Sequence, residues 1–199
     1  MIHLRIACFA TSNAEFRNVL DFYAYCGNKV LEPHGMALRH RYGEGPVIPD
    51  TVTWNGYVAS HDGTADRVAA LCRQLWPGAK GIPVILCNRG EGTDAVSKKQ
   101  YPYGWTMLAG DTDPNGRMCR IPFICINANK INPDGTVLVH ELIHAATNLG
   151  NEGHDSDPAS VFFSGYRNPD GQESDVERPR YLRKEHADSL RAASFAERS

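Results

Sequence analysis

Long apolar runs are absent from this sequence. No stretch of it approaches the ~20 consecutive apolar residues that a membrane-spanning helix needs. Near the start of the chain, His3 and Arg5 interrupt the apolar residues, so this segment lacks the continuous core of a signal peptide. We therefore expect no membrane partner and no export by the usual secretory route. The cytoplasm and a non-standard route of export both stay open.

The sequence also has little excess charge of either sign. Lys and Arg together number 21, Asp and Glu number 23, and the formal net charge is −2. A chain so close to neutral lacks the basic excess that is typical of nucleic-acid-binding proteins. We therefore expect no nucleic-acid partner, and we expect the chain to act as a monomer.

None of the six cysteines forms a C-x-x-C motif, so paired cysteines at metal-binding or redox spacing are missing. Most of the cysteines lie among apolar residues inside expected helices or strands, which favours buried thiols. A disulfide framework stays open as the alternative because their number is even. They are Cys8, Cys26, Cys72, Cys87, Cys119 and Cys125.

The composition is that of a globular domain, with 42% hydrophobic and 22% charged residues. We expect one domain over residues 1–199, with a sheet-rich part at 1–135 and a helical part at 136–199. Apolar periodicity predicts strands at 2–10, 51–60, 82–87, 105–108 and 121–127, weaker strand alternation at 36–42, and helices at 16–26, 64–76, 137–146 and 182–193.

Several boundaries have their own signals. Ser12–Glu15 reads as a capping box before the first helix, and Gly27-Asn28 is expected to end that helix. Glycine and proline over 43–50 predict a loop, and the charged residues 178–184 are expected to be the solvated start of the last helix. Asn132-Pro133-Asp134-Gly135 predicts a turn before the third helix.

The strongest chemical signal is His140-Glu141-Leu142-Ile143-His144, in the third expected helix. Residues four apart share one helix face, so His140 and His144 can present two imidazole nitrogens to one zinc ion, with Glu141 beside them. Zinc lowers the pKa of a bound water, the carboxylate takes its proton, and the metal polarises the carbonyl under attack. The rest of this helix is apolar nearly all round, which predicts that it is buried and that its polar groups need a partner such as a metal.

Ten residues beyond His144, the sequence continues with His154-Asp155-Ser156-Asp157-Pro158. Residues 140–166 together resemble the matrixin branch of the metzincin metallopeptidases, whose segment reads H-E-x-x-H-x-x-G-x-x-H-S-S-D-P-x-A-V-M-Y-P-x-Y. The resemblance implies that His140, His144 and His154 are zinc ligands and that Glu141 is the general base. It places Val161-Phe162-Phe163 in a tight turn beneath the metal. Tyr166 falls on a tyrosine that can hydrogen-bond the oxyanion, or it is a packed aromatic residue.

The sequence departs from this pattern at two places. Four residues are added between His144 and His154, which is about one helical turn. Either the helix runs one turn longer and breaks at Gly150, or it ends near Asn148 and residues 149–153 bulge before the chain returns to the metal. The second departure is Phe162, which stands where the family has a methionine that packs under the site.

The resemblance implies a metzincin-like α/β (α+β) fold. Its parts are a twisted, mostly parallel sheet with an antiparallel edge strand, a buried zinc-binding helix and a C-terminal helix. The implied function is a zinc-dependent metalloendopeptidase, with a protein or peptide substrate that pairs with the edge strand near Trp105 and Met107. A plain structural edge is the other interpretation of that strand.

Alternatives of function and of ligand stay open. The chain can instead be a zinc hydrolase of another amide, or a non-catalytic binding module with a structural zinc. Asp155 and Asp157 are rival third ligands because the added residues shift the register. Glu173 and Glu177 are the candidates for a glutamate ligand further along the chain.

Overall fold

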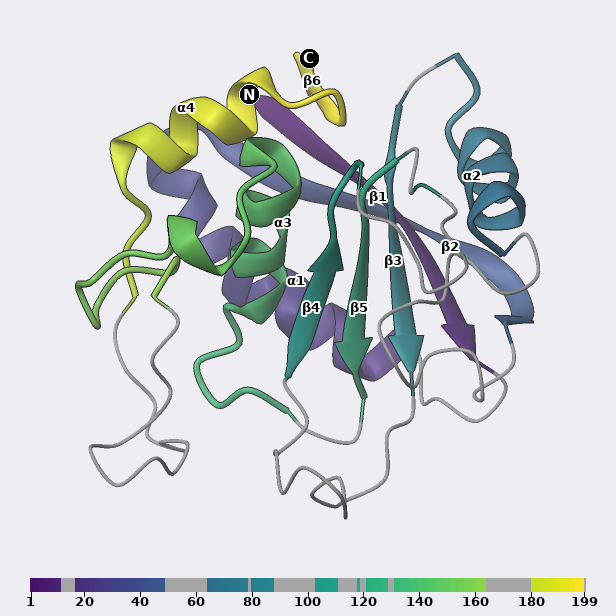
Figure 1. Ribbon diagram of the computed structural model, residues 1–199, viewed down its shortest axis with the longest axis horizontal. Coiled ribbons are helices and arrows are strands. Elements are labelled where there is room, and N and C mark those ends of the chain that lie inside the picture. Colours follow the sequence, from purple (N-terminus) through teal and green to yellow (C-terminus); the bar gives the residue numbers. More distant parts are fainter. Residues whose placement is uncertain are drawn as a thin grey trace.

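The computed structural model of the protein describes residues 1–11, 17–48, 64–78, 80–87, 103–110, 118, 121–128, 131–163 and 180–198. In these residues, strands build one sheet in the order β2-β1-β3-β5-β4, and a short strand β6 also pairs with β1 (Figure 1). The strands are β1 (Ile2–Thr11), β2 (Met36–Ile48), β3 (Ile82–Cys87), β4 (Gly104–Met107), β5 (Phe123–Asn127) and β6 (Ala196–Arg198). β2, β1, β3 and β5 are parallel, whereas β4 and β6 run antiparallel to their neighbours.

Helices cover both faces of this sheet, so the fold is mixed α/β. The α-helices of the described residues are α1 (Arg17–Leu31), α2 (Thr64–Leu75), α3 (Val137–Thr147) and α4 (Lys184–Ala192). α1 and α3 lie together on one face with α4 packed on α3, and α2 lies on the other face (Figure 1). No helix in the described part of the chain combines the length and the apolar character that crossing a membrane requires.

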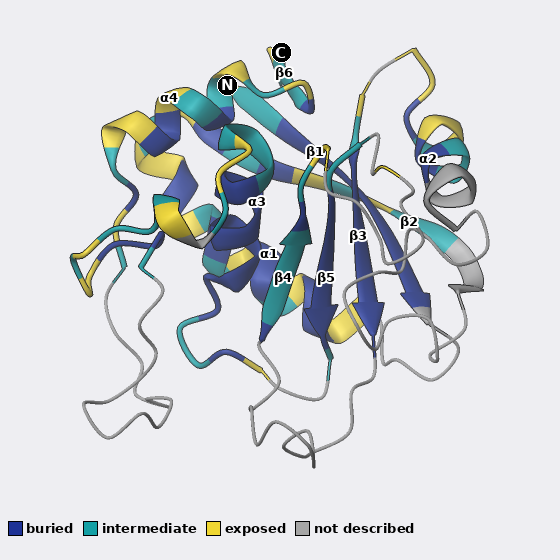
Figure 2. Cartoon of the chain, viewed as in Figure 1, coloured by how far each residue is buried: buried dark blue, intermediate teal, exposed yellow. Residues whose placement is uncertain are grey.

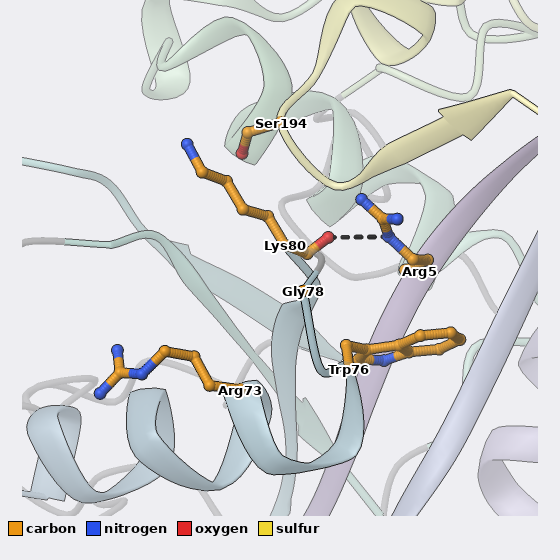
Figure 3. A pocket seen from close by; sticks show the side chains of 6 residues that line it. All are labelled: Arg5, Arg73, Trp76, Gly78, Lys80 and Ser194. Atoms are coloured by element: carbon orange, nitrogen blue, oxygen red, sulfur yellow. Dashed lines mark hydrogen bonds between the residues drawn. The ribbon is translucent and has the colours of Figure 1, made fainter.

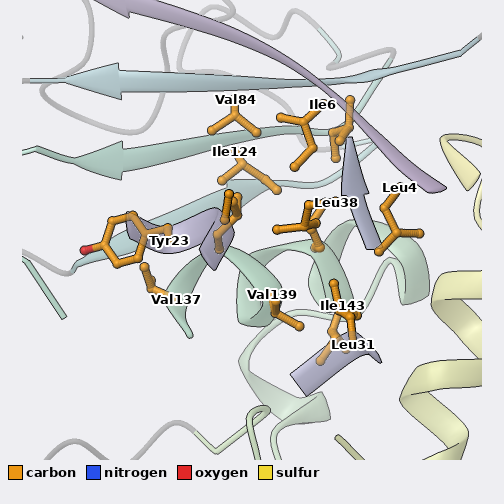
Figure 4. Packing of buried hydrophobic residues seen from close by; sticks show 14 of the residues in the cluster. Leu4, Ile6, Tyr23, Leu31, Leu38, Val84, Ile124, Val137, Val139 and Ile143 are labelled. Atoms are coloured by element: carbon orange, nitrogen blue, oxygen red, sulfur yellow. The ribbon is translucent and has the colours of Figure 1, made fainter. Parts of the chain in front are cut away.

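The alternation of side chains along β1 divides the core into two clusters. Leu4, Ile6 and Cys8 belong to the cluster on the side of α1 and α3. Leu38 of β2 and Val139 of α3 belong to the same cluster (Figure 4). Ala7 and Phe9 point the other way and pack with Cys72 and Trp76 from α2 and the residue that follows it. Successive side chains of a strand point to opposite faces, so one strand supplies both clusters. β3 and β5 are buried on both faces (Figure 2), as their continuous apolar sequences predict.

The structure confirms the expected α/β class, the mostly parallel sheet and the antiparallel edge strand. The strands expected at 2–10, 82–87, 105–108 and 121–127 correspond to β1, β3, β4 and β5, and three helices correspond to α2, α3 and α4. The expected burial of thiols holds for Cys8, Cys72, Cys87 and Cys125. The expected strand at 51–60, the capping box at Ser12–Glu15 and the residue Cys119 lie outside the described residues.

The prediction of a loop over residues 43–50 is wrong for most of this range, because β2 continues to Ile48. β2 pairs with β1 along this stretch with shifts of register on either side of Ala10, and these shifts accommodate the extra residues of β2 between Tyr42 and Ile48. β2 is the outermost strand of the sheet among the described residues, and proline is tolerated in an outer strand because one side of it needs no hydrogen-bonding partner. β6 was not expected at all, since three residues are too few to produce a sequence pattern.

The end expected for the first helix at Gly27-Asn28 is also wrong, because α1 continues to Leu31. Gly27 is buried within the helix, and a Cβ added to it would lie 2.9 Å from Val139 Cγ2 and 3.1 Å from Leu38 Cδ1. Glycine therefore allows α1 to approach α3 and β2 closely instead of ending the helix. The Asn28 side chain accepts a hydrogen bond of 2.8 Å from the backbone N–H of Leu38, which ties α1 to β2.

The turn over residues 132–135 fixes the start of α3. Gly135 has a φ of 67°, and a Cβ there would lie 2.5 Å from the Cys26 side chain, so the turn requires glycine. Asp134 Oδ1 accepts hydrogen bonds from the Thr136 N–H at 3.1 Å and from the Thr136 hydroxyl at 2.6 Å. Asp134 Oδ2 forms an ion pair with Arg180 Nε at 2.7 Å, with side chains only 3% and 2% exposed. The interpretation of residues 178–184 as a solvated segment is thus wrong for Arg180.

We predict that Asp134→Ala and Arg180→Ala each destabilise the protein by about 3–5 kcal/mol, because either change leaves a buried charge without its partner. The double variant should lose clearly less than the sum of the two single losses. Chemical denaturation of the four proteins measures this coupling. Lys184→Ala is the matched control, because it breaks an exposed ion pair with Asp188 and should cost ~0.5 kcal/mol or less. Additive single losses below about 1 kcal/mol would contradict the prediction.

Candidate metal and catalytic site

α3 carries the H-E-x-x-H segment in the interior of the protein. Every residue from Val137 to His144 is buried, and His140, Glu141 and His144 are only 8%, 5% and 7% exposed. The apolar residues of α3 pack into the core between the sheet, α1 and α4. The burial of the helix therefore forces three ionisable side chains into a place where they need specific partners.

Three imidazoles meet at one point beside α3. The Nε2 atoms of His140 and His144 are 3.2 Å apart, those of His140 and His154 are 3.1 Å apart, and those of His144 and His154 are 3.0 Å apart. We call these residues the histidine triad. Among the described residues, this is the group of His, Cys, Asp and Glu side chains whose ligand atoms lie close enough to hold a metal ion.

The hydrogen bonds on the far side of two rings decide which nitrogen carries the hydrogen. His140 Nδ1 lies 2.9 Å from the Val161 carbonyl oxygen, and His144 Nδ1 lies 2.6 Å from the Leu149 carbonyl oxygen. A carbonyl oxygen only accepts, so each Nδ1 must donate, and each neutral ring keeps a lone pair on Nε2. The two Nε2 atoms thus face each other as acceptors at 3.2 Å and cannot hydrogen-bond one another. A cation resolves this conflict.

The spacing of the triad fits zinc. Three nitrogens that bind one zinc ion at about 2.0–2.1 Å with tetrahedral angles lie about 3.3–3.4 Å from each other. The three Nε2 separations of 3.0–3.2 Å are within a few tenths of an ångström of that value. The hydrogen bonds from Nδ1 to backbone carbonyls are also the outer contacts that usually orient a metal-binding histidine. The histidine triad can therefore bind zinc.

The added residues between His144 and His154 take the second of the two expected courses. α3 ends at Thr147, Asn148 adopts the left-handed conformation with φ 55°, and residues 151–153 form a single 3₁₀ turn. This course places the Leu149 carbonyl against His144 Nδ1. The inserted segment thus orients a ring of the triad in addition to connecting α3 to His154.

Phe162 forms the floor of the triad. Its ring centroid lies 5.2 Å from that of His140, 4.7 Å from that of His144 and 5.0 Å from that of His154, and the residue is fully buried. Val161, its neighbour, supplies the carbonyl that orients His140. The turn that contains Phe162 therefore packs against all three imidazoles of the triad.

Asp155 and Asp157, the rival third ligands, are engaged away from the triad. Asp155 Oδ2 accepts hydrogen bonds from the Ser160 hydroxyl and from His186 Nε2, the latter at 3.1 Å. Asp157 accepts hydrogen bonds from the Ala159 N–H at 2.9 Å and from the Tyr181 hydroxyl at 2.7 Å. The histidine triad contains neither carboxylate. Tyr166, Glu173 and Glu177 lie outside the described residues.

A polar network that the sequence did not reveal braces the same turn. Arg183 Nε lies 3.4 Å from Asp155 Oδ2, and the His186 ring packs 4.8 Å from the Phe162 ring. The Asp155 N–H also donates to the Phe162 carbonyl at 2.9 Å. Asp155 directly follows His154, so the start of α4 and the turn at Phe162 are both tied to the residue next to the third histidine.

Glu141 has a hydrogen-bonding partner on the edge strand. The Thr106 hydroxyl lies 2.7 Å from Glu141 Oε2 and 3.0 Å from the Glu141 carbonyl oxygen. Burial raises the pKa of Glu141 to about 8, although the Thr106 hydrogen bond acts in the opposite direction. A cation held by the triad would lower this pKa further and favour the carboxylate.

Trp105 and Met107, the expected substrate-facing residues, pack instead into the core cluster on the α2 side.

The imidazoles of His140 and His144 are neutral over a wide range of pH. Burial lowers the pKa of His140 to about 3, with a further contribution from His144, and burial lowers the pKa of His144 to about 4. Metal binding requires unprotonated imidazole nitrogens. The triad is therefore ready to bind a cation at neutral pH without first releasing protons from these two rings.

We predict that protonation of His140 and His144 weakens zinc binding only as the pH approaches 4, where His144 becomes protonated. Histidines with the ordinary pKa of about 6.5 would begin to lose affinity near that pH. Competition with a chromophoric chelator at each pH measures the dissociation constant. His34→Ala, which lies outside the triad, is the control. A steady weakening that begins at pH 6.5 would contradict the prediction.

No protein-family model and no curated relative matches the chain. Among solved structures, the fold is similar to archaemetzincin from Methanopyrus kandleri, with 13% sequence identity and a TM-score of 0.46 over 96% of this chain and 94% of that chain. It is also similar to a zinc-dependent peptidase from Methanocorpusculum labreanum, with 13% identity and a TM-score of 0.46 over 93% of this chain and 99% of that chain. At this level of similarity, the function is inferred from the side chains of the site.

Proposed function

We propose that the chain is a zinc-dependent metalloendopeptidase of the metzincin type. In this proposal His140, His144 and His154 hold the zinc ion and Glu141 is the general base. The observation that carries it is the convergence of three imidazole Nε2 atoms within 3.2 Å of one another, next to a buried glutamate of the same helix. A buried arrangement of this kind is costly without a cation, because it sets lone pairs against each other.

The number of ligands supports a catalytic site over a structural one. Structural zinc sites are closed by four protein ligands, whereas catalytic sites use three and keep one position open. The described part of the chain brings no fourth His, Cys, Asp or Glu to the triad. The nearest rivals in sequence, Asp155 and Asp157, are held by hydrogen bonds elsewhere.

The proposed chemistry divides between the metal and Glu141. Bound to the triad, zinc supplies Lewis acidity that lowers the pKa of a water molecule and polarises the carbonyl group of the substrate. Glu141 takes a proton from the attacking water and delivers it to the nitrogen of the leaving amine.

Thr106 positions the general base. Its hydroxyl has one hydrogen, and two acceptor oxygens of Glu141 lie within 3.0 Å of it. Donation to Oε2 holds the carboxylate in one rotamer, and donation to the backbone carbonyl stays available when the carboxyl is protonated. The edge strand therefore contributes to the site through Thr106, the residue of β4 that faces α3.

The same edge strand supports an extended peptide as the substrate. β4 is the last strand of the sheet order in the described residues, and it pairs only with β5 there. An extended peptide can add to such an edge through backbone hydrogen bonds, and this places its carbonyl groups near residues that contact β4. α3 is packed against β4, so a peptide on this edge would run beside the metal-binding helix. Tyr166 as oxyanion donor stays a prediction from the family resemblance.

We predict that the purified protein contains about one equivalent of zinc and hydrolyses a denatured protein substrate in a chelator-sensitive manner. Glu141→Gln should keep the zinc and the thermal stability, because glutamine has nearly the same shape and zinc is held by the histidines. Hydrolysis should fall by a factor of about 10²–10⁴, the contribution expected from a positioned general base. Metal analysis, thermal melting and peptide hydrolysis measure the three quantities, and Glu32→Gln on the surface is the control.

Two outcomes would redirect the proposal. Wild-type protein that binds zinc but neither cleaves peptides nor binds a hydroxamate would favour a binding module with a structural zinc. Hydroxamate binding together with inactivity on peptides would favour hydrolysis of another amide. Wild-type protein that contains no zinc, prepared without chelator, would overturn the metal site itself.

We predict that Thr106→Val lowers kcat by about tenfold or more and leaves the zinc content unchanged, since a hydrogen bond to a charged group is worth ~1.5–3 kcal/mol. Thr106→Ser keeps the hydroxyl and should restore most of the rate. KM should change little, because the hydroxyl contacts Glu141 and not the substrate. Equal rates for the valine and serine variants would show that the hydroxyl does not position the base.

A further inference from the structure

A pocket of about 460 Å³ lies near the ends of β1, α2 and α4, on the sheet face that α2 covers (Figure 3). Its lining consists of Arg5, Arg73, Trp76, Gly78, Lys80 and Ser194. The histidine triad lies beside α3 on the opposite face of the sheet, so the two sites share no residue. Three of the six lining residues are cations, in a chain whose formal net charge is −2.

Arg5 is held rigidly in the wall of this pocket. Its Nε donates to the Lys80 carbonyl at 2.9 Å (Figure 3). Its side chain is only 8% exposed, and its Nη1 pairs with Glu197 at 3.2 Å. Its Nη2 has no hydrogen-bond partner among the described residues. A buried guanidinium with unused hydrogens is a preorganised donor for an anion.

Three further polar side chains of the lining are available to a ligand. The side chains of Arg73, Lys80 and Ser194 form no ion pair and no hydrogen bond with the described part of the chain. Glu197 is the carboxylate that pairs with Arg5, and it is shared with Arg39 at 3.7 Å. Positive charge is therefore in excess around the pocket, and donors outnumber acceptors.

Trp76 provides a fixed apolar wall. Its indole N–H donates to the Ile6 carbonyl at 3.1 Å, and the Arg41 guanidinium lies 4.2 Å from its ring. Two rigid elements, Trp76 and Arg5, thus frame the pocket, and the exposed side chains of Arg73 and Lys80 can turn toward a ligand between them. The volume falls in the range of small-molecule sites, about 300–1,000 Å³.

We propose that this pocket binds a small organic phosphate monoester. The donors come from three separate side chains instead of one planar fork, which suits a tetrahedral group with three acceptor oxygens better than a flat carboxylate. A phosphate monoester carries about −1.5 to −2 charges at neutral pH, and three cations line this pocket, of which only Arg5 is paired with a carboxylate, that of Glu197. The remaining volume accommodates an organic group beside Trp76.

Titration of the zinc-loaded protein with phenyl phosphate and with inorganic phosphate, followed by calorimetry, tests the proposal. Lys80→Ala and Arg73→Ala should each weaken phenyl phosphate binding by about tenfold, because each removes a charged donor from the phosphate. Both side chains are exposed and lack partners in the described residues, so thermal stability should be unchanged. Lys29→Ala, an exposed lysine on α1, is the control and should bind like the wild type.

Several outcomes would overturn the proposal. They are no binding by the wild type at millimolar concentration, binding that survives both pocket substitutions, and equal weakening by Lys29→Ala. A flotation assay with vesicles that contain phosphatidic acid separates a lipid headgroup from a free phosphate ester, and binding to vesicles alone would favour a membrane surface. The site does not depend on the proposed peptidase activity, so Glu141→Gln should bind phenyl phosphate as the wild type does.

Discussion

Two backbone carbonyl groups determine which nitrogen atoms of the histidine triad can bind a cation. The carbonyls of Val161 and Leu149 each accept the Nδ1 hydrogen of a histidine, and each thereby leaves a lone pair on the opposite nitrogen of that ring. These lone pairs point toward one another, and for this reason the site favours a cation; the presence of histidines alone would not have this effect. Both carbonyls belong to irregular segments beyond α3, so the course of the chain after the helix is part of the metal site.

The remainder of the fold holds these segments in place. α3 is fixed at its start by the turn at Gly135 and by the buried pair of Asp134 and Arg180. Arg180 also donates to the Ser160 carbonyl at 3.3 Å, so one side chain connects the start of α3 with the turn that carries Val161 and Phe162. The close approach of α1 at Gly27 completes the packing around the helix. These contacts together favour one arrangement of the three imidazole rings of the triad.

The sequence predicts much of this organisation, and the failures have physical causes. The apolar periodicity of β3, β5 and α3 predicts their burial, and the spacing of His140, Glu141 and His144 places them on one helix. The contribution of Leu149 could not be predicted, because a backbone carbonyl has no sequence signature. Thr106 looked like one residue of an edge strand, and only the packing of β4 on α3 reveals its contact with Glu141. Gly27 resembled a helix end because its role depends on a neighbour more than 100 residues away in sequence.

The direct succession of His154 and Asp155 couples the metal site to the C-terminal part of the chain. Asp155 contacts His186 and Arg183, and β6, which follows α4, adds a strand to β1. Whatever stabilises His154 in its place therefore also favours the docking of α4, and thermodynamic linkage requires the reverse to hold with equal free energy. A cation bound by the triad would therefore stabilise the docking of α4 and β6. A substitution that weakens this docking would lower the affinity of the triad for the cation, although α4 and β6 do not contact the cation.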